Sequence, residues 1–278
     1  MKYTHTLFLS FVLSCLLFTG CTTPQSTMHE NGNVLPPLKL SDHTIQAVLW
    51  QQNAAEYRAL SYQAFNIAQL RLDQFLKEKD GKGKKAAIIT DIDETVMDNT
   101  PSSVKNIEEN QEFSEEEWAQ WVHQEKATEV PGAAKFLNYA KAKGVEIFYV
   151  SNRVTSAEEA TIQNMKTLGF PYADKAHLLF RGDQSSKKER FEQVNATHDV
   201  LLYLGDNLSD FSHRFEVPST KKRNAAADDL ESEFGNRFIV LPNPIYGDWE
   251  TKGIFKGKYN WTAKEKDSLR RAQLKSYH

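Results

Sequence analysis

Short apolar runs recur along the chain, and most of them stop abruptly at polar residues. The clearest runs cover residues 86–90, 145–150, 177–180, 199–204 and 237–241. Short apolar runs without a polar alternation are typical of strands that are buried on both faces of a parallel sheet. The pattern therefore predicts a buried parallel sheet that is built from these runs.

Helical periodicity fills the segments between the predicted strands. Apolar residues recur at three- or four-residue steps over residues 42–79, which predicts one long core-packing helix. Another helix is expected to begin at Ser114, whose hydroxyl would cap the first turn, with Glu117 completing a capping box. Further helices are predicted over residues 131–143, 224–234 and 262–277. The alternation of strands and helices places the chain in the α/β class.

Residues 1–20 have the pattern of a signal peptide. The apolar segment over residues 7–18 is too short to span a bilayer but fits the hydrophobic region of such a peptide. Small residues precede Cys21 as in a bacterial lipobox, so we expect Cys21 to become a lipid-modified N-terminus that anchors the protein. Thr22 follows, whereas lipoproteins of the inner membrane often carry Asp there, which favours the bacterial outer membrane. A periplasmic protein secreted without lipid is the alternative.

A tether and one folded unit are expected after the signal peptide. Residues 21–42 are rich in Thr, Pro, Gln, Ser and Asn, which predicts a flexible tether between the membrane and a unit over residues 43–278. The only cysteines are Cys15 and Cys21, so the mature chain has no disulfide and no cysteine nucleophile. The net charge of -3 gives no basic surface for a nucleic acid polymer.

Two carboxylates follow the first apolar run directly. Asp91 and Asp93 lie where the strand ends, and ligands of open α/β sheets bind beyond the carboxyl ends of the strands. The side chains of Asp91 and Asp93 would point to the same side of an extended chain, so a site that uses one carboxylate and one backbone carbonyl requires the chain to curl there. It can then present one carboxylate and one backbone carbonyl to a common point, which suits Mg²⁺. The alternative is that Asp91 only ends the strand and Asp93 only begins a turn.

Polar residues also follow the later strands. Ser151 follows the second run, and a hydroxyl with neighbouring N–H groups can hold phosphate oxygens, although an ordinary helix start is the alternative. A lysine near a helix N-terminus opposes the helix dipole, so Lys187 or Lys188 either points to solvent or neutralises a local anion. Asp206 and Asp210 follow the fourth run and share one face if a helical turn follows.

These segments together resemble a known family. The D-x-D-x-T motif that begins at Asp91 resembles motif I of the haloacid dehalogenase (HAD) superfamily of phosphotransferases. Ser151 resembles motif II, Lys187 resembles motif III with Lys188 as the alternate, and the G-D-N-L-x-D-F segment around Asp206 resembles motif IV. The helix over residues 49–60 and the L-P-N-x-x-Y-G-x-W-E segment are similar to those of class C bacterial acid phosphatases of the outer-membrane lipoprotein e type.

The resemblance implies a fold and a metal site. The fold would be a Rossmann-like parallel sheet with a smaller, mainly helical cap from about residues 43–80 and 97–130. The metal ligands would be Asp91, the carbonyl of Asp93 and Asp206, with Asp210 behind them, and the metal would be Mg²⁺.

The resemblance also implies a mechanism. Asp91 would attack phosphorus and become an aspartyl-phosphate, while Asp93 would act first as an acid and then as a base. Ser151 and Lys187 would hold the phosphoryl oxygens during the reaction.

The implied function is an Mg²⁺-dependent acid phosphatase acting on small phosphate monoesters such as 5′-nucleotides and nicotinamide mononucleotide. Asn152, Arg153 and Tyr246 are candidate substrate contacts, and Tyr246 would stack on the base unless its ring only packs within its own loop. A phosphotransferase that uses an alcohol in place of water stays open, and so does a homodimer. The alternative from another class is a surface lipoprotein that binds a ligand on a phosphatase fold without turnover.

Overall fold

A parallel sheet forms the centre of the fold. The computed structural model describes residues 40–277, which belong to one unit. The sheet has the strand order β5-β4-β1-β6-β7, and every pairing in it is parallel. The strands are β1 (Lys85–Thr90), β4 (Glu146–Val154), β5 (Leu178–Arg181), β6 (His198–Gly205) and β7 (Phe238–Val240). The predicted parallel α/β core is confirmed, with each predicted strand displaced by only a few residues.

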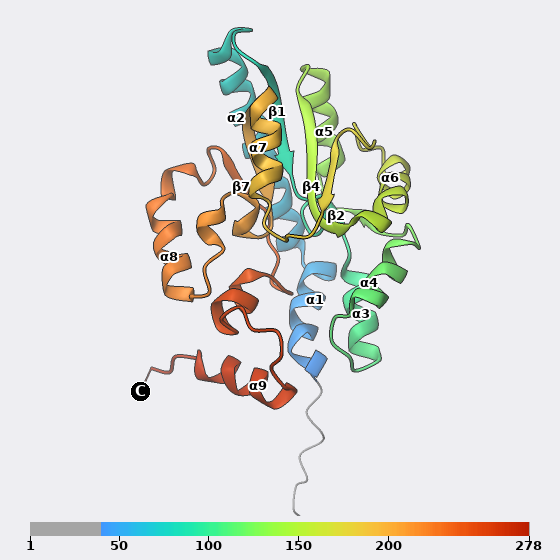
Figure 1. Cartoon of the computed structure of the whole chain (residues 1–278), viewed down its shortest axis with the longest axis vertical. Helices are drawn as coiled ribbons and strands as arrows, with labels where there is room; N and C mark the ends of the chain where they lie inside the picture. Colours follow the sequence, from blue (N-terminus) through green and yellow to red (C-terminus); the bar gives the residue numbers. More distant parts are fainter. Residues whose placement is uncertain (1–39, 278) are drawn as a thin grey trace, which may run out of the picture. The chain divides into compact units, whose positions relative to one another are not determined.

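Helices cover both faces of this sheet (Figure 1). The residues of β1 alternate between the two sides: Ile88 packs in one cluster, and Ala87 and Ile89 pack in the other. One face is covered by α2 (Ala55–Lys79), α5 (Ala133–Ala142) and α6 (Glu158–Thr167), and the other face is covered by α7 (Lys188–Thr197). Burial on both sides explains why the strands are continuous apolar runs without alternation.

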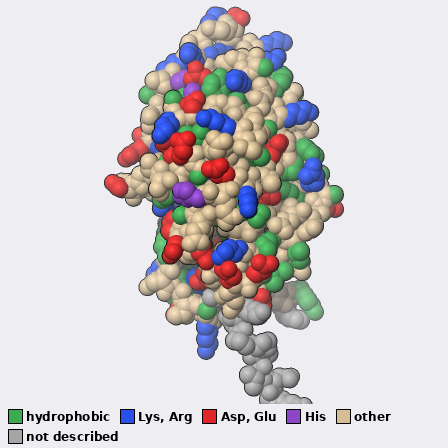
Figure 2. Space-filling view, turned by 90° about the vertical axis from the view of Figure 1, so that its right-hand side faces the viewer, with side chains coloured by type: hydrophobic (Ala, Val, Ile, Leu, Met, Phe, Trp, Pro, Cys, Tyr) green, Lys and Arg blue, Asp and Glu red, His purple; other side chains and the backbone are tan. Residues whose placement is uncertain are grey.

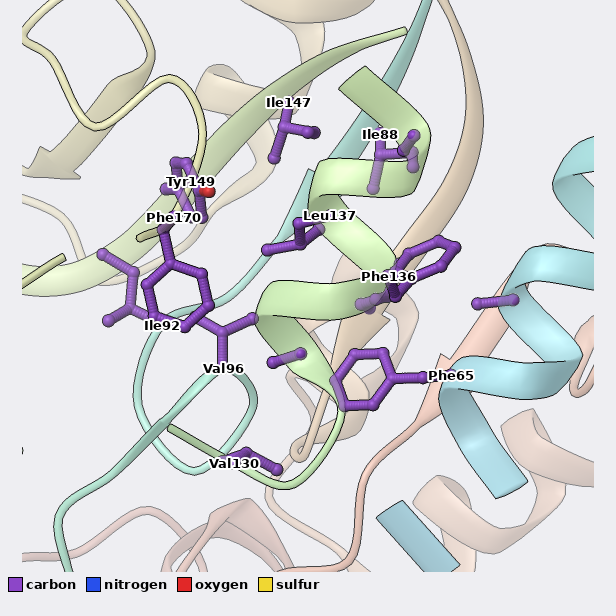
Figure 3. Packing of buried hydrophobic residues seen from close by; sticks show 14 of the residues in the cluster. Phe65, Ile88, Ile92, Val96, Val130, Phe136, Leu137, Ile147, Tyr149 and Phe170 are labelled. Carbon is purple, nitrogen blue, oxygen red and sulfur yellow. The ribbon is translucent and has the colours of Figure 1, made fainter. Parts of the chain in front are cut away.

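The larger cluster holds α2 and α5 against the sheet (Figure 3). The rings of Phe65 and Phe136 lie 5.8 Å apart, and Leu137 and Ile88 have no exposed surface. Truncating a fully buried leucine such as Leu137 to alanine typically costs about 2–5 kcal/mol of folding free energy. This packing fixes β1 at the centre of the sheet, so the residues that directly follow β1 are attached to a rigid strand.

A second group of helices lies beyond the carboxyl ends of the strands (Figure 1). It consists of α1 (Ile45–Asn53), α3 (Thr100–Glu108) and α4 (Glu115–Val122), with the antiparallel pair β2 (Met97–Asp98) and β3 (Thr128–Glu129). Ser114 caps α4 as predicted and accepts from the Glu117 N–H at 3.2 Å. The predicted capping box is wrong, because the Glu117 carboxylate accepts from Lys105 and Gln111 instead of the Ser114 N–H. The predicted cap region therefore divides, because α2 packs on the sheet while α1, α3 and α4 lie at its carboxyl edge.

The C-terminal part continues around β7. It contains α8 (Thr220–Asp229), a π-helical turn η6 (Trp249–Ile254) and α9 (Ala263–Ala272). Gly235 has the positive φ of +74° that glycine allows, and it precedes β7. Among the described residues, no helix is both long and apolar enough to cross a bilayer. The predicted signal peptide, Cys21 and nearly all of the tether lie outside the described residues.

Candidate active site

The chain curls tightly where it leaves β1. The Asp91 N–H still donates to the Leu204 carbonyl of β6 at 2.9 Å, which extends the sheet by one bond. The N–H groups of Val96 and Met97 then both donate to the Ile92 carbonyl, at 3.0 and 2.9 Å. Glu94 adopts a φ of +54°, which reverses the chain. The predicted curl is confirmed, and it turns the side chains of Asp91 and Asp93 to different partners.

Lys187 lies between two carboxylates at this edge. Its Nζ is 2.6 Å from Asp91 Oδ1 and 2.7 Å from Asp210 Oδ1, and its side chain is only 6% exposed. Lys188 points outward, where its side chain is 53% exposed and 3.7 Å from Glu192. Of the two lysines left open by the sequence, Lys187 is therefore the one at the site.

Asp206 is held by two neutral donors. Thr95 Oγ1 donates to Asp206 Oδ1 at 2.9 Å, and Asn243 Nδ2 donates to Oδ2 at 2.8 Å. The side chain of Asp210 folds back toward Asp206, and its carboxylate accepts from the Asn207 N–H at 3.0 Å. Gly205 makes this approach feasible, since a Cβ there would lie 2.4 Å from the Asp210 Cβ.

Three carboxylates come together here with one cation. Oxygens of Asp91, Asp206 and Asp210 all lie within 4.8 Å of one another, whereas the carboxylate of Asp93 is not in the group. Burial, followed by the neighbouring charge of Asp210, raises the pKa of Asp206 to about 7. Burial also raises the pKa of Asp91 well above its usual range, although Lys187 opposes the shift. An all-oxygen site with excess negative charge fits a hard divalent cation.

Asp93 turns toward a separate set of donors. Arg153 donates to Asp93 Oδ1 through Nη2 at 2.8 Å and through Nε at 3.1 Å, and Asn99 Nδ2 donates to the same oxygen at 2.9 Å. Asp93 Oδ2 has only longer contacts, 3.3 Å to Arg153 Nε and 3.4 Å to Ser151 Oγ. The side chain of Asp93 is thereby fixed in orientation, with Oδ2 as the less occupied oxygen.

Arg153 differs from its prediction as a substrate contact. It is 3% exposed, and besides Asp93 it donates to Thr161 and Asn99, at 2.9 and 3.3 Å. Its guanidinium also lies over the ring of Trp118, 5.6 Å from the ring centre, so α4 contacts this network. The guanidinium of Arg153 is therefore buried and bonded to Asp93 rather than exposed to solvent.

The other predicted substrate contacts lie at the edge of the site. Asn152 is exposed, and its side-chain oxygen Oδ1 accepts from Arg190 Nη2 at 2.7 Å. Tyr246 is 41% exposed, and its hydroxyl donates to the carboxylate of Glu94, which is 1% exposed. Burial, then the charges of Asp93 and Asp206, raises the pKa of Glu94 well above its usual range.

A polar pocket opens beside Lys187 and Asp210. Its volume is about 150 Å³, and Asn152, Asn207 and Lys252 also line it. Hydroxyl, amide and ammonium groups of the lining can bind the oxygens of a small phosphate ester, and the carboxylates of Asp210, Glu216 and Asp248 line the pocket as well.

Several residues at the site were not assigned from the sequence. Asn243 follows β7 at the same edge as Asp91 and Asp206, so the rule that found those aspartates could have found it too. Asn99 and Arg190 lie in or beside helices among ordinary polar residues, and no local pattern distinguishes them. Their partners become visible only when the helices are placed on the sheet.

Comparisons with known proteins agree with this geometry. The family model described as HAD superfamily, subfamily IIIB (acid phosphatase) matches residues 18–249. A structure of the class C acid phosphatase from Bacillus anthracis is 41% identical, covers 87% of this chain and 100% of its own chain, and has a TM-score of 0.83. A crystal structure of the B. anthracis enzyme with tungstate bound is likewise 41% identical, with a TM-score of 0.83. The match covers 87% of this chain and 100% of that chain. The stem 31 kDa glycoprotein of Glycine max is 26% identical over 163 residues, and the match spans 56% of this chain and 57% of that relative.

Proposed function

Because the chain belongs to the acid phosphatases of HAD subfamily IIIB, we propose that it hydrolyses small phosphate monoesters at the carboxyl edge of its sheet. The resemblance found in the motifs is thus confirmed at the level of the family. One observation carries the proposal: the buried Lys187 bridges Asp91 and Asp210 directly beyond β1. A buried lysine between carboxylates keeps its charge, so it can stabilise a transferred phosphoryl group.

Asp91 is the proposed nucleophile. Its carboxylate lies at the end of the central strand, and its backbone is fixed by the bond to Leu204, so the attacking oxygen is held in place. Attack on phosphorus forms an aspartyl-phosphate and releases the leaving oxygen. Lys187 is placed to hold the oxygens of the phosphoryl group as the charge shifts, and the Ser151 hydroxyl is proposed to do the same.

Asp93 is the proposed acid and base. Arg153 and Asn99 occupy Oδ1, so Oδ2 is the oxygen that carries the proton to the leaving group. The same oxygen then takes a proton from the water that attacks the aspartyl-phosphate. Asp93 gives up a proton in the first step and regains one from the water in the second, so the residue is restored after each turnover.

The proposed cofactor is Mg²⁺, held by Asp91, the Asp93 carbonyl and Asp206, with Asp210 behind them. When bound, the ion would screen the negative charge of the substrate and polarise a phosphoryl oxygen. Local charge has to do this, because the net charge is -3 and basic and acidic side chains are mixed on the face shown in Figure 2. A phosphate dianion gains little from a face of this mixed charge.

The proposed substrates are 5′-nucleotides and nicotinamide mononucleotide. Tyr246 supports this assignment, because its hydroxyl is anchored on Glu94 while 41% of its surface is exposed. A ring fixed at one end offers a flat surface on which a base can stack. Tyr246→Ala would remove the ring, and Tyr246→Phe would keep the ring but lose its anchor on Glu94, so the ratio of KM for nucleotides to KM for an aryl phosphate is expected to rise more in the alanine variant than in the phenylalanine variant.

We also propose that Cys21 carries a lipid that anchors the protein in the outer membrane. The support is the apolar segment over residues 7–18 followed by small residues and Cys21. Metabolic labelling with a radioactive fatty acid is expected to mark the wild type and not Cys21→Ser. Labelling of neither protein would leave a periplasmic location as the better explanation.

The test of the activity measures phosphate release from AMP and nicotinamide mononucleotide at mildly acidic pH. Wild type and Asp91→Asn are compared with Mg²⁺ and with EDTA. Turnover that needs the metal and disappears in Asp91→Asn is the expected result. Absence of turnover with any phosphomonoester would instead favour a lipoprotein that only binds its ligand.

A further inference from the structure

Arg190 connects the two segments that carry Ser151 and Lys187. It lies in α7, one helical turn after Lys187, so both side chains leave the same face of the helix. Its guanidinium donates to acceptors in three segments of the chain. They are the Ser151 carbonyl at 2.6 Å, the Leu179 carbonyl at 3.4 Å, the Asn152 side chain at 2.7 Å, and the carbonyls of Ser185 and Ser186 at 3.3 and 3.1 Å.

The first of these contacts lies where the sheet is irregular. The register between β4 and β5 shifts between Val150 and Val154, and Ser151 lies inside this interval. No β5 residue is aligned with Ser151 there, and Nη1 of the Arg190 guanidinium donates to the Ser151 carbonyl instead. Irregular strand positions beside a site re-aim side chains, and this one turns the Ser151 hydroxyl toward Asp93.

Two further contacts of Arg190 lie in the loop that leads into α7. Ser185 and Ser186 directly precede Lys187, and both of their carbonyls accept from Arg190. This bonding orients the loop just before Lys187 reaches back to Asp91. One planar group therefore sets the position of Ser151 relative to Lys187, although it touches neither side chain's polar end.

We propose that Arg190 is a positioning residue, which holds Ser151 and Lys187 at the spacing that a bound phosphoryl group requires. The inference rests on the proposed phosphatase function. A lysine could not replace this group, because an ammonium lacks the planar fork that reaches acceptors in separate segments. Arg190 thus acts on the reaction through the two residues that hold phosphoryl oxygens.

The test compares Arg190→Ala and Arg190→Lys with a control, Arg71→Ala. Arg71 is also partly buried and donates to a backbone carbonyl, that of Gly235 at 2.9 Å, but its partners do not belong to the site. We expect kcat/KM of Arg190→Ala to fall about 100-fold, because small displacements of positioned groups cost rates of this order. Arg190→Lys should lose activity as well, and Arg71→Ala should retain it.

Two further measurements separate positioning from a general loss of structure. Guanidinium, added well below denaturing concentrations, should restore part of the activity of Arg190→Ala and none in Lys187→Met. Inorganic phosphate should bind Arg190→Ala more weakly than wild type in calorimetry, which requires no turnover. If Arg190→Ala does not fold, Arg190→Lys carries the same comparisons, apart from guanidinium rescue.

Unchanged kcat/KM and unchanged phosphate binding in both Arg190 variants would overturn the inference. A loss of activity that only follows the folded fraction, with no response to guanidinium, would also overturn it. Failure of the proposed function has a different outcome, since the wild type itself would then release no phosphate. Phosphate binding by calorimetry would still decide the role of Arg190 in that case.

Discussion

The amino and carboxyl edges of the sheet both carry charged residues, but these residues differ in their burial and in the partners of their carboxylates. At the amino ends of β1, β4 and β6, Glu146 Oε1 lies 3.1 Å from Lys85 Nζ, and Oε2 lies 2.8 Å from His198 Nε2. At the carboxyl ends, oxygens of Asp91, Asp206 and Asp210 lie within 4.8 Å of one another, and Lys187 pairs with Asp91 and Asp210. The side chain of Lys85 is 76% exposed, whereas that of Lys187 is 6% exposed.

The difference appears in the pKa values of the carboxyl groups. Partial burial alone would raise the pKa of Glu146, but the hydrogen bonds from Lys85 and His198 outweigh it and lower the pKa. At the other end burial dominates and raises the pKa values of Asp91 and Asp206. A carboxylate with a hydrogen-bonding partner on each oxygen is satisfied within the protein, whereas a buried excess of carboxylates favours the binding of a cation.

Removal of Lys187 should have the largest effect. We expect Lys187→Met to lower kcat/KM by about 1000-fold, because loss of one group that stabilises developing charge costs up to this order. Lys188→Met is the matched control, since Lys188 is half exposed and lies beside Glu192. Steady-state kinetics with an aryl phosphate measures both. Equal losses in the two variants would contradict the assignment of the site to Lys187.

Addition of Mg²⁺ should raise the free energy of unfolding through the carboxylates at the carboxyl ends of the strands. Mg²⁺ at about 100 times its Kd should stabilise the folded wild type by about 2.7 kcal/mol, because it binds only the folded state. EDTA should reverse the effect, and Asp206→Asn should lose most of it. Thermal unfolding with and without Mg²⁺ measures the shift. A full shift in Asp206→Asn would place the metal elsewhere.

Substitution of Glu146 should have the smallest effect. Glu146→Gln should leave kcat/KM unchanged and cost about 0.5 kcal/mol of folding stability, as expected for a partly exposed ion pair. The folded pKa lies below the ordinary value of 4.5, so the stabilising contribution is complete above pH 4.5 and is lost as the pH falls through the folded pKa. Urea unfolding of both proteins from neutral to acidic pH should therefore show curves that converge at low pH. A gap that widens on acidification would reverse this sign.

The sequence predicted the sheet and the aspartates well for one physical reason. Strands that are buried on both faces are apolar throughout, so the polar residue that ends each run marks the carboxyl edge. Asp91, Asp206 and Ser151 all follow such runs, and the structure brings them to one edge of the sheet. Because every pairing in the sheet is parallel, the carboxyl ends of these strands meet at one edge, although the order of the strands in the sheet differs from their order along the chain.

Contacts that depend on how helices are placed could not be predicted in the same way. The helix expected over residues 42–79 is interrupted at Ala54, which has extended φ and ψ, although no proline or glycine is present. Bonds from Gln51 to Asp98 and from Gln52 to Thr100 hold α1 toward α3. These tertiary contacts override the local helical preference, and they have no local pattern in the sequence.

Arg153 and Arg190 show the same limit at the site. Their places after a strand and within a helix indicated polar surroundings, but their partners depend on side-chain direction. Guanidinium groups reach several acceptors at once, so one change in helix position would exchange a whole set of bonds.

Capture of the phosphorylated enzyme tests most directly whether Asp91 is the nucleophile. Asp93→Asn is mixed with an aryl phosphate, whose good leaving group needs no acid, and the reaction is quenched in acid and analysed by peptide mass spectrometry. If Asp91 is the nucleophile, one phosphoryl group is expected on the peptide that contains Asp91, and none when Asp91→Asn is added to the same chain. Release of the aryl alcohol without any phosphorylated peptide, or with the phosphoryl group on another residue, would contradict it.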